Sequence, residues 1–122
     1  MNKVQAYFAF WSQFGWAVYD ETSTPDDAEM PRITLEFGND DFGHPIALVA
    51  SLWTRSTSWE AVELKAIQIE QTIAKGGIIV TYNDGGNAFW IERGSPWAQR
   101  MADSSDDMVR RIVLNLEVEF LD

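Results

Sequence analysis

The chain has 122 residues, 46% of them hydrophobic, which suffices for one core, so we expect a single domain over residues 1–122. It contains no cysteine, which excludes disulfides, thiolate metal sites and thiol chemistry. Its formal net charge of -10 argues against specific binding to nucleic-acid phosphates. No apolar run approaches the roughly 18 residues that span a bilayer, so we expect a soluble protein with no membrane partner.

The first expected element is a helix from Lys3 to Phe14, where apolar side chains recur at steps of three and four. Gly15 follows at a position where helices commonly stop. The apolar segment Trp16 to Tyr19 then predicts a short strand. The polar segment Asp20 to Pro31 predicts a loop.

Alternating polar and apolar residues predict a second strand from Arg32 to Phe37 and a third from Ile46 to Thr54, paired as a hairpin. A capping-box pattern at Thr57 to Glu60 then precedes an apolar stripe, which predicts a second helix. This helix is expected to end at Gly76 and Gly77, and its stripe to lie on the sheet. The stripe consists of Trp59, Val62, Ala66, Ile69 and Ile73.

A second hairpin is predicted from strands Ile78 to Tyr82 and Ala88 to Glu92, joined by a turn rich in Asn, Asp and Gly. The last strand, Ile112 to Phe120, has the most regular alternation, so we expect it to pair inside the sheet. The predicted fold class is α+β: an antiparallel or mixed β-sheet with two α-helices packed on one face, in the order α-β-β-β-α-β-β-β.

The segment Arg93 to Asp107 separates two predicted strands and is expected to be a long loop. Long loops in small domains often carry function. Its arginines can pair with its aspartates inside one chain or across an interface. Its tryptophan, Trp97, is either an anchor that folds back on the domain or a contact for another protein.

Catalytic and metal chemistry find little support. The single histidine, His44, lies in a predicted turn, so a histidine relay or a multi-histidine metal site is excluded. The spacing of Asp103, Asp106 and Asp107 lacks the glycine-centred loop of an EF-hand, and Asp106 is expected to cap a turn before the last strand. We therefore expect no enzyme, no metal and no cofactor.

Aromatic and arginine side chains are the stronger signal, because Trp and Arg are enriched in interface hot spots. Trp11, Trp59 and Trp90 lie in periodic patterns and are expected in the core. The predicted subunit interface consists of Trp53, Arg55, Arg93, Trp97, Gln99, Arg100, Asp103, Asp106 and Asp107.

Acidic residues are concentrated in the first third of the chain. One interpretation is a solvated face that maintains solubility. The other is a face that lines a passage or contacts a basic partner. The residues of this candidate face are Asp26, Asp27, Glu29, Asp40 and Asp41.

Several of these segments together resemble a known family. The run Ala50 to Trp59, the run Arg93 to Met101, the pair Asp106 and Asp107, and Pro25 to Ala28 before Pro31 resemble small tail proteins of long-tailed phages and prophages of Gram-positive bacteria. The resemblance spans nearly the whole chain and is to proteins of the tail terminator or tail completion type.

This resemblance implies a structural role without catalytic residues. It implies a homo-oligomeric ring, of six members, that caps the tail tube and contacts both the tail tube protein and a head-completion protein. It places the protein in the virion tail, and in the host cytoplasm during assembly, with DNA passing through the ring. The alternatives are a neighbouring head–tail connector subunit and a free-standing protein-binding module.

Overall fold

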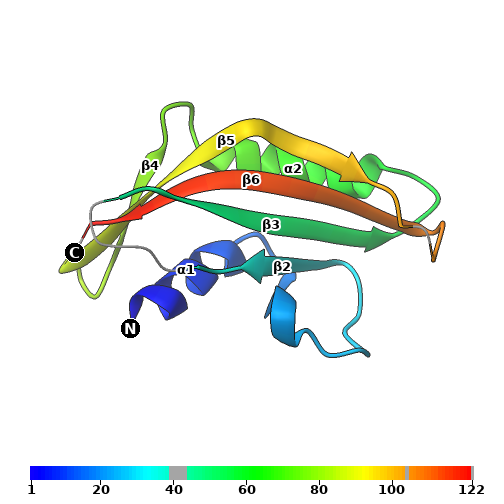
Figure 1. Cartoon of the computed structure of the whole chain (residues 1–122), viewed down its shortest axis with the longest axis horizontal. Helices are drawn as coiled ribbons and strands as arrows, with labels where there is room; N and C mark the ends of the chain where they lie inside the picture. The colour runs from blue at the N-terminus through cyan, green and yellow to red at the C-terminus, as the bar shows by residue number, and fades with distance from the viewer. Residues whose placement is uncertain (39–43, 104, 122) are drawn as a thin grey trace.

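The computed structural model describes residues 1–38, 44–103 and 105–121. It confirms the α+β class, with a six-stranded mixed sheet of strand order β1-β2-β3-β6-β5-β4 (Figure 1). Strands β1 and β2 are parallel, and every other neighbouring pair is antiparallel. The elements are α1 (Lys3–Ser12), β1 (Ala17–Asp20), a 3-10 helix η1 (Glu21–Ser23), β2 (Arg32–Glu36), β3 (Ile46–Arg55), α2 (Glu60–Thr72), β4 (Ile78–Tyr82), β5 (Asn87–Met101) and β6 (Val109–Phe120).

The two helices begin differently from each other. At α1, the Asn2 side chain accepts from the Gln5 backbone and the Gln5 side chain accepts from the Asn2 backbone, which is a capping box. The capping box predicted for α2 at Thr57 is wrong. Trp59 occupies the cap position without a side-chain cap bond, and the hydroxyl of Ser58 accepts the Glu60 N–H instead, at 3.0 Å.

One face of the sheet forms the core together with both helices. Leu114 on β6 lies opposite Ala50 on β3, and both are fully buried, as is Val62 on α2. Tyr7 on α1 contacts the ring of Phe89 on β5, with ring centroids 6.0 Å apart. The regular alternation along β6 therefore leaves its other residues on the outer face of the sheet, which neither helix covers.

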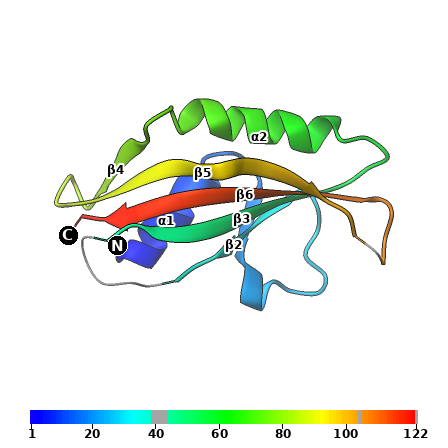
Figure 2. The same ribbon diagram turned by 45° about the horizontal axis from the view of Figure 1, so that its top comes forward.

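The long loop predicted from Arg93 to Asp107 is wrong over most of its length. β5 continues through this segment to Met101 and pairs with β6, so the connection between the two strands is only residues 102–108. Figures 1 and 2 show β5 and β6 as two long neighbouring strands, with α2 running alongside β5. The segment is thus largely a strand in the sheet.

A bulge in β5 interrupts the alternation of polar and apolar residues, so the sequence pattern does not indicate this strand. Arg93 pairs with Leu116 and Ala98 pairs with Leu114, so the four residues 94–97 of β5 lie opposite Asn115 alone. Gly94 permits the close approach, because a β-carbon there would lie 3.0 Å from the Asn115 carbonyl oxygen. The Asn115 side-chain amide donates to the carbonyl of Pro96 at 2.9 Å, which satisfies part of the interrupted ladder.

Candidate functional site

The predicted interface residues divide into three groups in the structure. Arg93, Trp97, Gln99 and Arg100 lie on the second half of β5. Asp103, Asp106 and Asp107 lie in or beside the turn between β5 and β6, where Arg55 joins them. Trp53 lies apart from both groups, on the outer face of β3.

The arginines of β5 form ion pairs with α2. Arg93 Nη1 lies 3.4 Å from Glu70 Oε1, and Arg100 Nε lies 2.7 Å from Glu63 Oε1. Arg100 also stacks over the Trp59 ring, 4.7 Å from its centroid. Within one chain, these two arginines therefore pair with glutamates of α2 and not with Asp103, Asp106 or Asp107.

The bulge explains how these two pairs match in spacing. Glu63 and Glu70 are seven residues apart on a helix, which separates them by ~10.5 Å along the axis. Seven residues of regular strand would extend ~23 Å. Arg93 and Arg100 instead lie opposite Leu116 and Ile112, only ~13 Å apart along β6. The spacing of residues in the sequence does not reveal the bulge. The sequence alone therefore does not indicate that Glu63 and Glu70 pair with these arginines.

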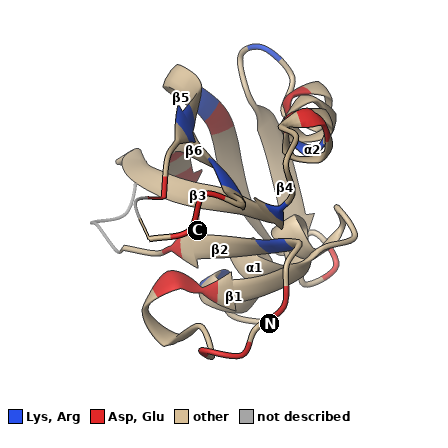
Figure 3. Ribbon diagram, turned by 90° about the vertical axis from the view of Figure 1, so that its right-hand side faces the viewer, with Lys and Arg blue, Asp and Glu red and all other residues tan. Residues whose placement is uncertain are grey.

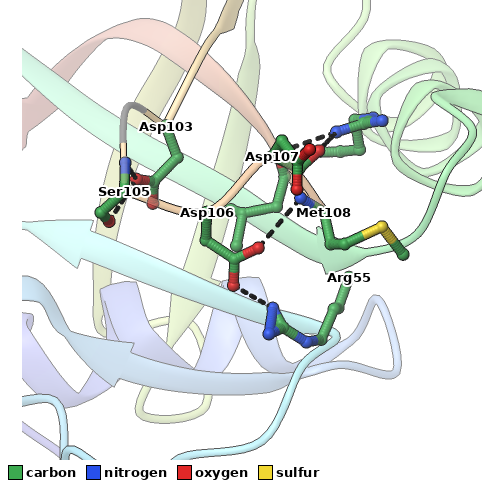
Figure 4. A network of polar contacts seen from close by, with 8 residues as sticks. Arg55, Asp103, Ser105, Asp106, Asp107 and Met108 are labelled. Carbon is green, nitrogen blue, oxygen red and sulfur yellow. Dashed lines mark hydrogen bonds and ion pairs between the residues drawn. The ribbon is translucent and has the colours of Figure 1, made fainter.

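The turn between β5 and β6 is held by its own carboxylates (Figure 4). Asp103 accepts from the hydroxyl and the backbone N–H of Ser105, at 2.7 and 2.9 Å, and these bonds lower the pKa of its carboxyl group. Asp106 accepts from the Met108 N–H at 3.0 Å, which confirms the predicted turn cap, and its other oxygen pairs with Arg55. Arg110 donates to the backbone carbonyl of Asp107.

Trp53 forms part of a stacked row on the outer face of the sheet. Its ring lies between two guanidinium groups, with Arg32 at 5.3 Å and Arg111 at 4.3 Å from its centroid. Its indole N–H donates to Thr34 Oγ1 at 2.8 Å, and Arg111 Nη2 donates to Ser51 Oγ at 3.0 Å. This row explains why Thr34 and Ser51 are buried although they face outward.

Trp97 and Gln99 have different environments on the same strand. Trp97 is half-buried and packs against the core, which corresponds to the anchor interpretation, although from a strand rather than a loop. It also lines a surface hollow of about 360 Å³ with Lys75, Gly76, Glu92, Arg93 and Gly94. Gln99 is exposed and lies on the outer face, since it pairs with Val113.

The second half of β5 has β6 on one side only. β4 pairs with Asn87 to Ile91, and in the described part of the chain no strand pairs with the other edge of β5 beyond that point. The exposed residues along this part are Ser95, Pro96, Ala98, Gln99, Arg100 and Met101. Such an edge presents unpaired backbone groups to any neighbouring chain.

Three of the acidic candidate residues lie beside β1, the strand at the opposite edge of the sheet from β5, where Figure 3 shows acidic segments of the chain. Asp26, Asp27 and Glu29 belong to the connection between η1 and β2 and are exposed. Two hollows of about 500 and 540 Å³ flank this connection, the second reaching Ala17 and Tyr19 of β1. Asp40 and Asp41 lie outside the described residues.

Among the described residues, no group of three His, Cys, Asp or Glu side chains is placed to hold a metal ion. None of the described helices has the length and apolar character needed to cross a membrane. Neither a protein-family model, nor a curated protein, nor a solved structure matches this chain.

Proposed function

We propose that this protein is a ring-forming structural subunit of a phage tail, of the tail terminator or tail completion type. The observation that carries the proposal is a sheet with an unpaired edge at each end, at β1 and at the second half of β5. A head-to-tail ring needs two different patches on one subunit, each complementary to the other. Two separate strand edges meet that requirement.

The two ends of the sheet carry mixed charge. At the β1 end, Asp26, Asp27 and Glu29 share a hollow with Arg32 and Arg55. At the β5 end, Arg93 and Arg100 pair with Glu70 and Glu63, and Lys75 shares its hollow with Glu92. The support for a head-to-tail arrangement is therefore the presence of two different strand edges, not the net charge of the two ends.

In this role the ring stops polymerisation of the tail tube and presents a surface to the head-completion protein. The subunit needs no cofactor for that role. Its location is the virion tail, and the host cytoplasm before assembly. The net charge of -10 on each copy repels DNA phosphates, so the genome passes the ring without binding to it.

The test is the mass of the particle in solution. Native mass spectrometry and sedimentation are applied to the protein alone and after addition of the tail tube protein encoded in the same genome. We expect six-membered rings, formed either by the protein alone or on the tube, and electron microscopy should show tubes with a closed end. If the protein stays monomeric and does not associate with the tube protein, the proposal is refuted and a free-standing binding module is favoured.

A further inference from the structure

β4 forms one outer edge of the sheet (Figure 2). It pairs with β5 through all five of its residues, Ile78 to Tyr82, and no strand in the described part of the chain lies on its other side. Its extensive contacts with other described elements are likewise with β5 alone. The backbone groups on the free side of this strand are therefore open to pairing with another strand.

This edge lacks the features that protect most sheet edges. The strand Ile78 to Tyr82 contains no charged residue, no proline and no glycine, and its pairing with β5 has no bulge. Natural edge strands commonly carry charges, prolines or bulges that prevent a second strand from adding. The second half of β5 carries such residues, with Pro96 and Arg100. β4 instead has the composition of a strand that pairs on both sides.

The apolar core is also incompletely covered at β4. Ile78, Val80 and Tyr82 face the core and pack against it, but they are only half-buried, whereas Phe89 opposite Val80 is fully buried. On the outer face of the same strand, Ile79 is 57% exposed. A strand added to the free edge would therefore bury apolar surface on both faces of β4, which stabilises an association.

A second copy of β4 fits this edge in an antiparallel pairing about a two-fold axis at Val80. In this register the core-facing residues of both copies stay on one face of the joined sheet. Val80 then lies opposite Val80 of the second copy, and Ile78 lies opposite Tyr82 of the second copy, twice by symmetry. Aromatic side chains opposite β-branched ones are favourable cross-strand pairs. β4 is thus complementary to itself, as a two-fold contact requires.

The charges that flank β4 favour the antiparallel direction. Lys75 precedes the strand and Asp84 follows it, and neither makes an ion pair with another described residue, although Lys75 shares a hollow with Glu92. Antiparallel pairing brings the Lys75 end of each strand to the Asp84 end of the other. Parallel pairing would place like charges together. Because exposed ion pairs add little affinity, these charges set the direction of the strands rather than the strength of the contact.

We infer that two copies of this chain pair through β4, antiparallel and centred on Val80, so that their sheets join into one. Main-chain hydrogen bonds and the half-exposed apolar residues of β4 supply the affinity. This contact goes beyond the ring contact of the proposed function. It leaves β1 and Ala98–Met101 unpaired, so both contacts can form on the same subunit.

Charge substitutions on the outer face of β4 test the inference. Ile79 and Thr81 are exposed there, and the two-fold register places each opposite the other in the second copy. The double variant Ile79→Lys with Thr81→Lys makes the chain less negative overall, yet it should raise the dissociation constant of the dimer by at least about tenfold, because like charges then lie opposite each other twice. The double variant Ile79→Glu with Thr81→Glu should also be monomeric. An equimolar mixture of the two variants should form a heterodimer, detected by native mass spectrometry.

The matched control is Ala47→Lys with Gln99→Lys. Both residues are exposed on the outer face, on β3 and β5, so this variant has the same net charge as the lysine variant of β4. It should dimerise at least as well as the wild type. Circular dichroism checks that all variants are folded. Equal dimerisation of the β4 variants and the control, or a mixture that gives no heterodimer, overturns the inference.

Single cysteines test the register, because the chain has no cysteine of its own. Val80→Cys places two thiols directly opposite each other, and mild oxidation should give a covalent dimer and no larger species. Thr81→Cys is the control, because residue 81 lies diagonally from its own counterpart, at ~7 to 8 Å, which is too far for a disulfide. Equal cross-linking of the two variants would exclude the register centred on Val80.

The outcome for β4 is separable from the outcome for the ring. If the wild type alone stays monomeric at millimolar concentration but forms rings with tube protein, the β4 contact is wrong and the proposed function survives. If dimers form through β4 but tube protein produces no ring, the inference stands and the proposed function fails.

Discussion

At the residue scale, Tyr7 combines complete burial with an unsatisfied polar group. Its side chain is 0% exposed, and within the described part of the chain its hydroxyl makes no hydrogen bond of normal geometry, although the indole of Trp11 lies near enough to lower its pKa slightly against the effect of burial. A buried hydroxyl without a partner costs folding free energy that a ring of the same shape does not. We therefore expect Tyr7→Phe to raise the free energy of unfolding by about 1 kcal/mol, measured by urea denaturation.

The pH dependence of the same variant adds a check with a definite sign. Burial raises the pKa of Tyr7, so the unfolded chain loses this proton at a lower pH than the folded chain. The contribution of the protonated Tyr7 to the free energy of unfolding is then fully present below pH about 10 and declines as the pH rises above it. The stability gap between Tyr7→Phe and the wild type should widen above that pH. Tyr19→Phe is the control, and an equal response in it, or a destabilised Tyr7→Phe, would contradict this account.

Substitutions at two adjacent glycines distinguish the cost of a steric clash from the cost of backbone strain. Gly76 and Gly77 both have a φ of +89°, where a side chain is strained. A β-carbon at Gly77 would lie 2.3 Å from Trp90 Nε1, whereas nothing lies within 4 Å of one at Gly76. Gly76→Ala should cost about 1 kcal/mol and Gly77→Ala at least about 3 kcal/mol. Equal thermal shifts for the two variants would mean that Trp90 does not hold this position in solution.

At the scale of elements, β5 sets the role of Trp97. This side chain is half-buried against the core, so Trp97→Ala should destabilise the monomer by about 2 kcal/mol, below the range for fully buried tryptophans. Gln99→Ala, on the exposed outer face of the same strand, should change stability by less than about 0.5 kcal/mol. Denaturation of both variants checks this. A Trp97→Ala monomer as stable as the wild type that no longer forms rings would show that Trp97 is primarily a subunit contact.

The periodicity of apolar residues correctly predicts those helices and strands whose regular repeat is not interrupted by an inserted residue. The alternation of Ile112 to Phe120 correctly predicts an inner strand, and the stripe from Val62 to Ile73 correctly predicts the buried face of α2. The bulge at residues 94–97 breaks the alternation of β5, and its Gly and Pro resemble turn residues. The ion pairs of Arg93 and Arg100 depend on that bulge, which is why the sequence pointed to the nearer aspartates. Asp106 could be assigned correctly because its cap is a local interaction.

At the scale of the whole molecule, electrostatic repulsion opposes the proposed assembly. Each copy carries a net charge of -10, which repels its neighbours over distances up to about a Debye length. The Debye length falls from ~30 Å at 0.01 M salt to ~8 Å at 0.15 M and ~3 Å at 1 M. Added salt therefore screens the repulsion between copies progressively.

Self-association should accordingly strengthen steadily with salt, with a dissociation constant that falls from 0.01 M through 0.15 M to 1 M sodium chloride. Sedimentation equilibrium at the three concentrations measures this. A placement of Asp26, Asp27 and Glu29 along the central passage predicts the same direction, because only repulsion is then screened. A dissociation constant that rises with salt would instead show that unlike charges attract at the subunit contact.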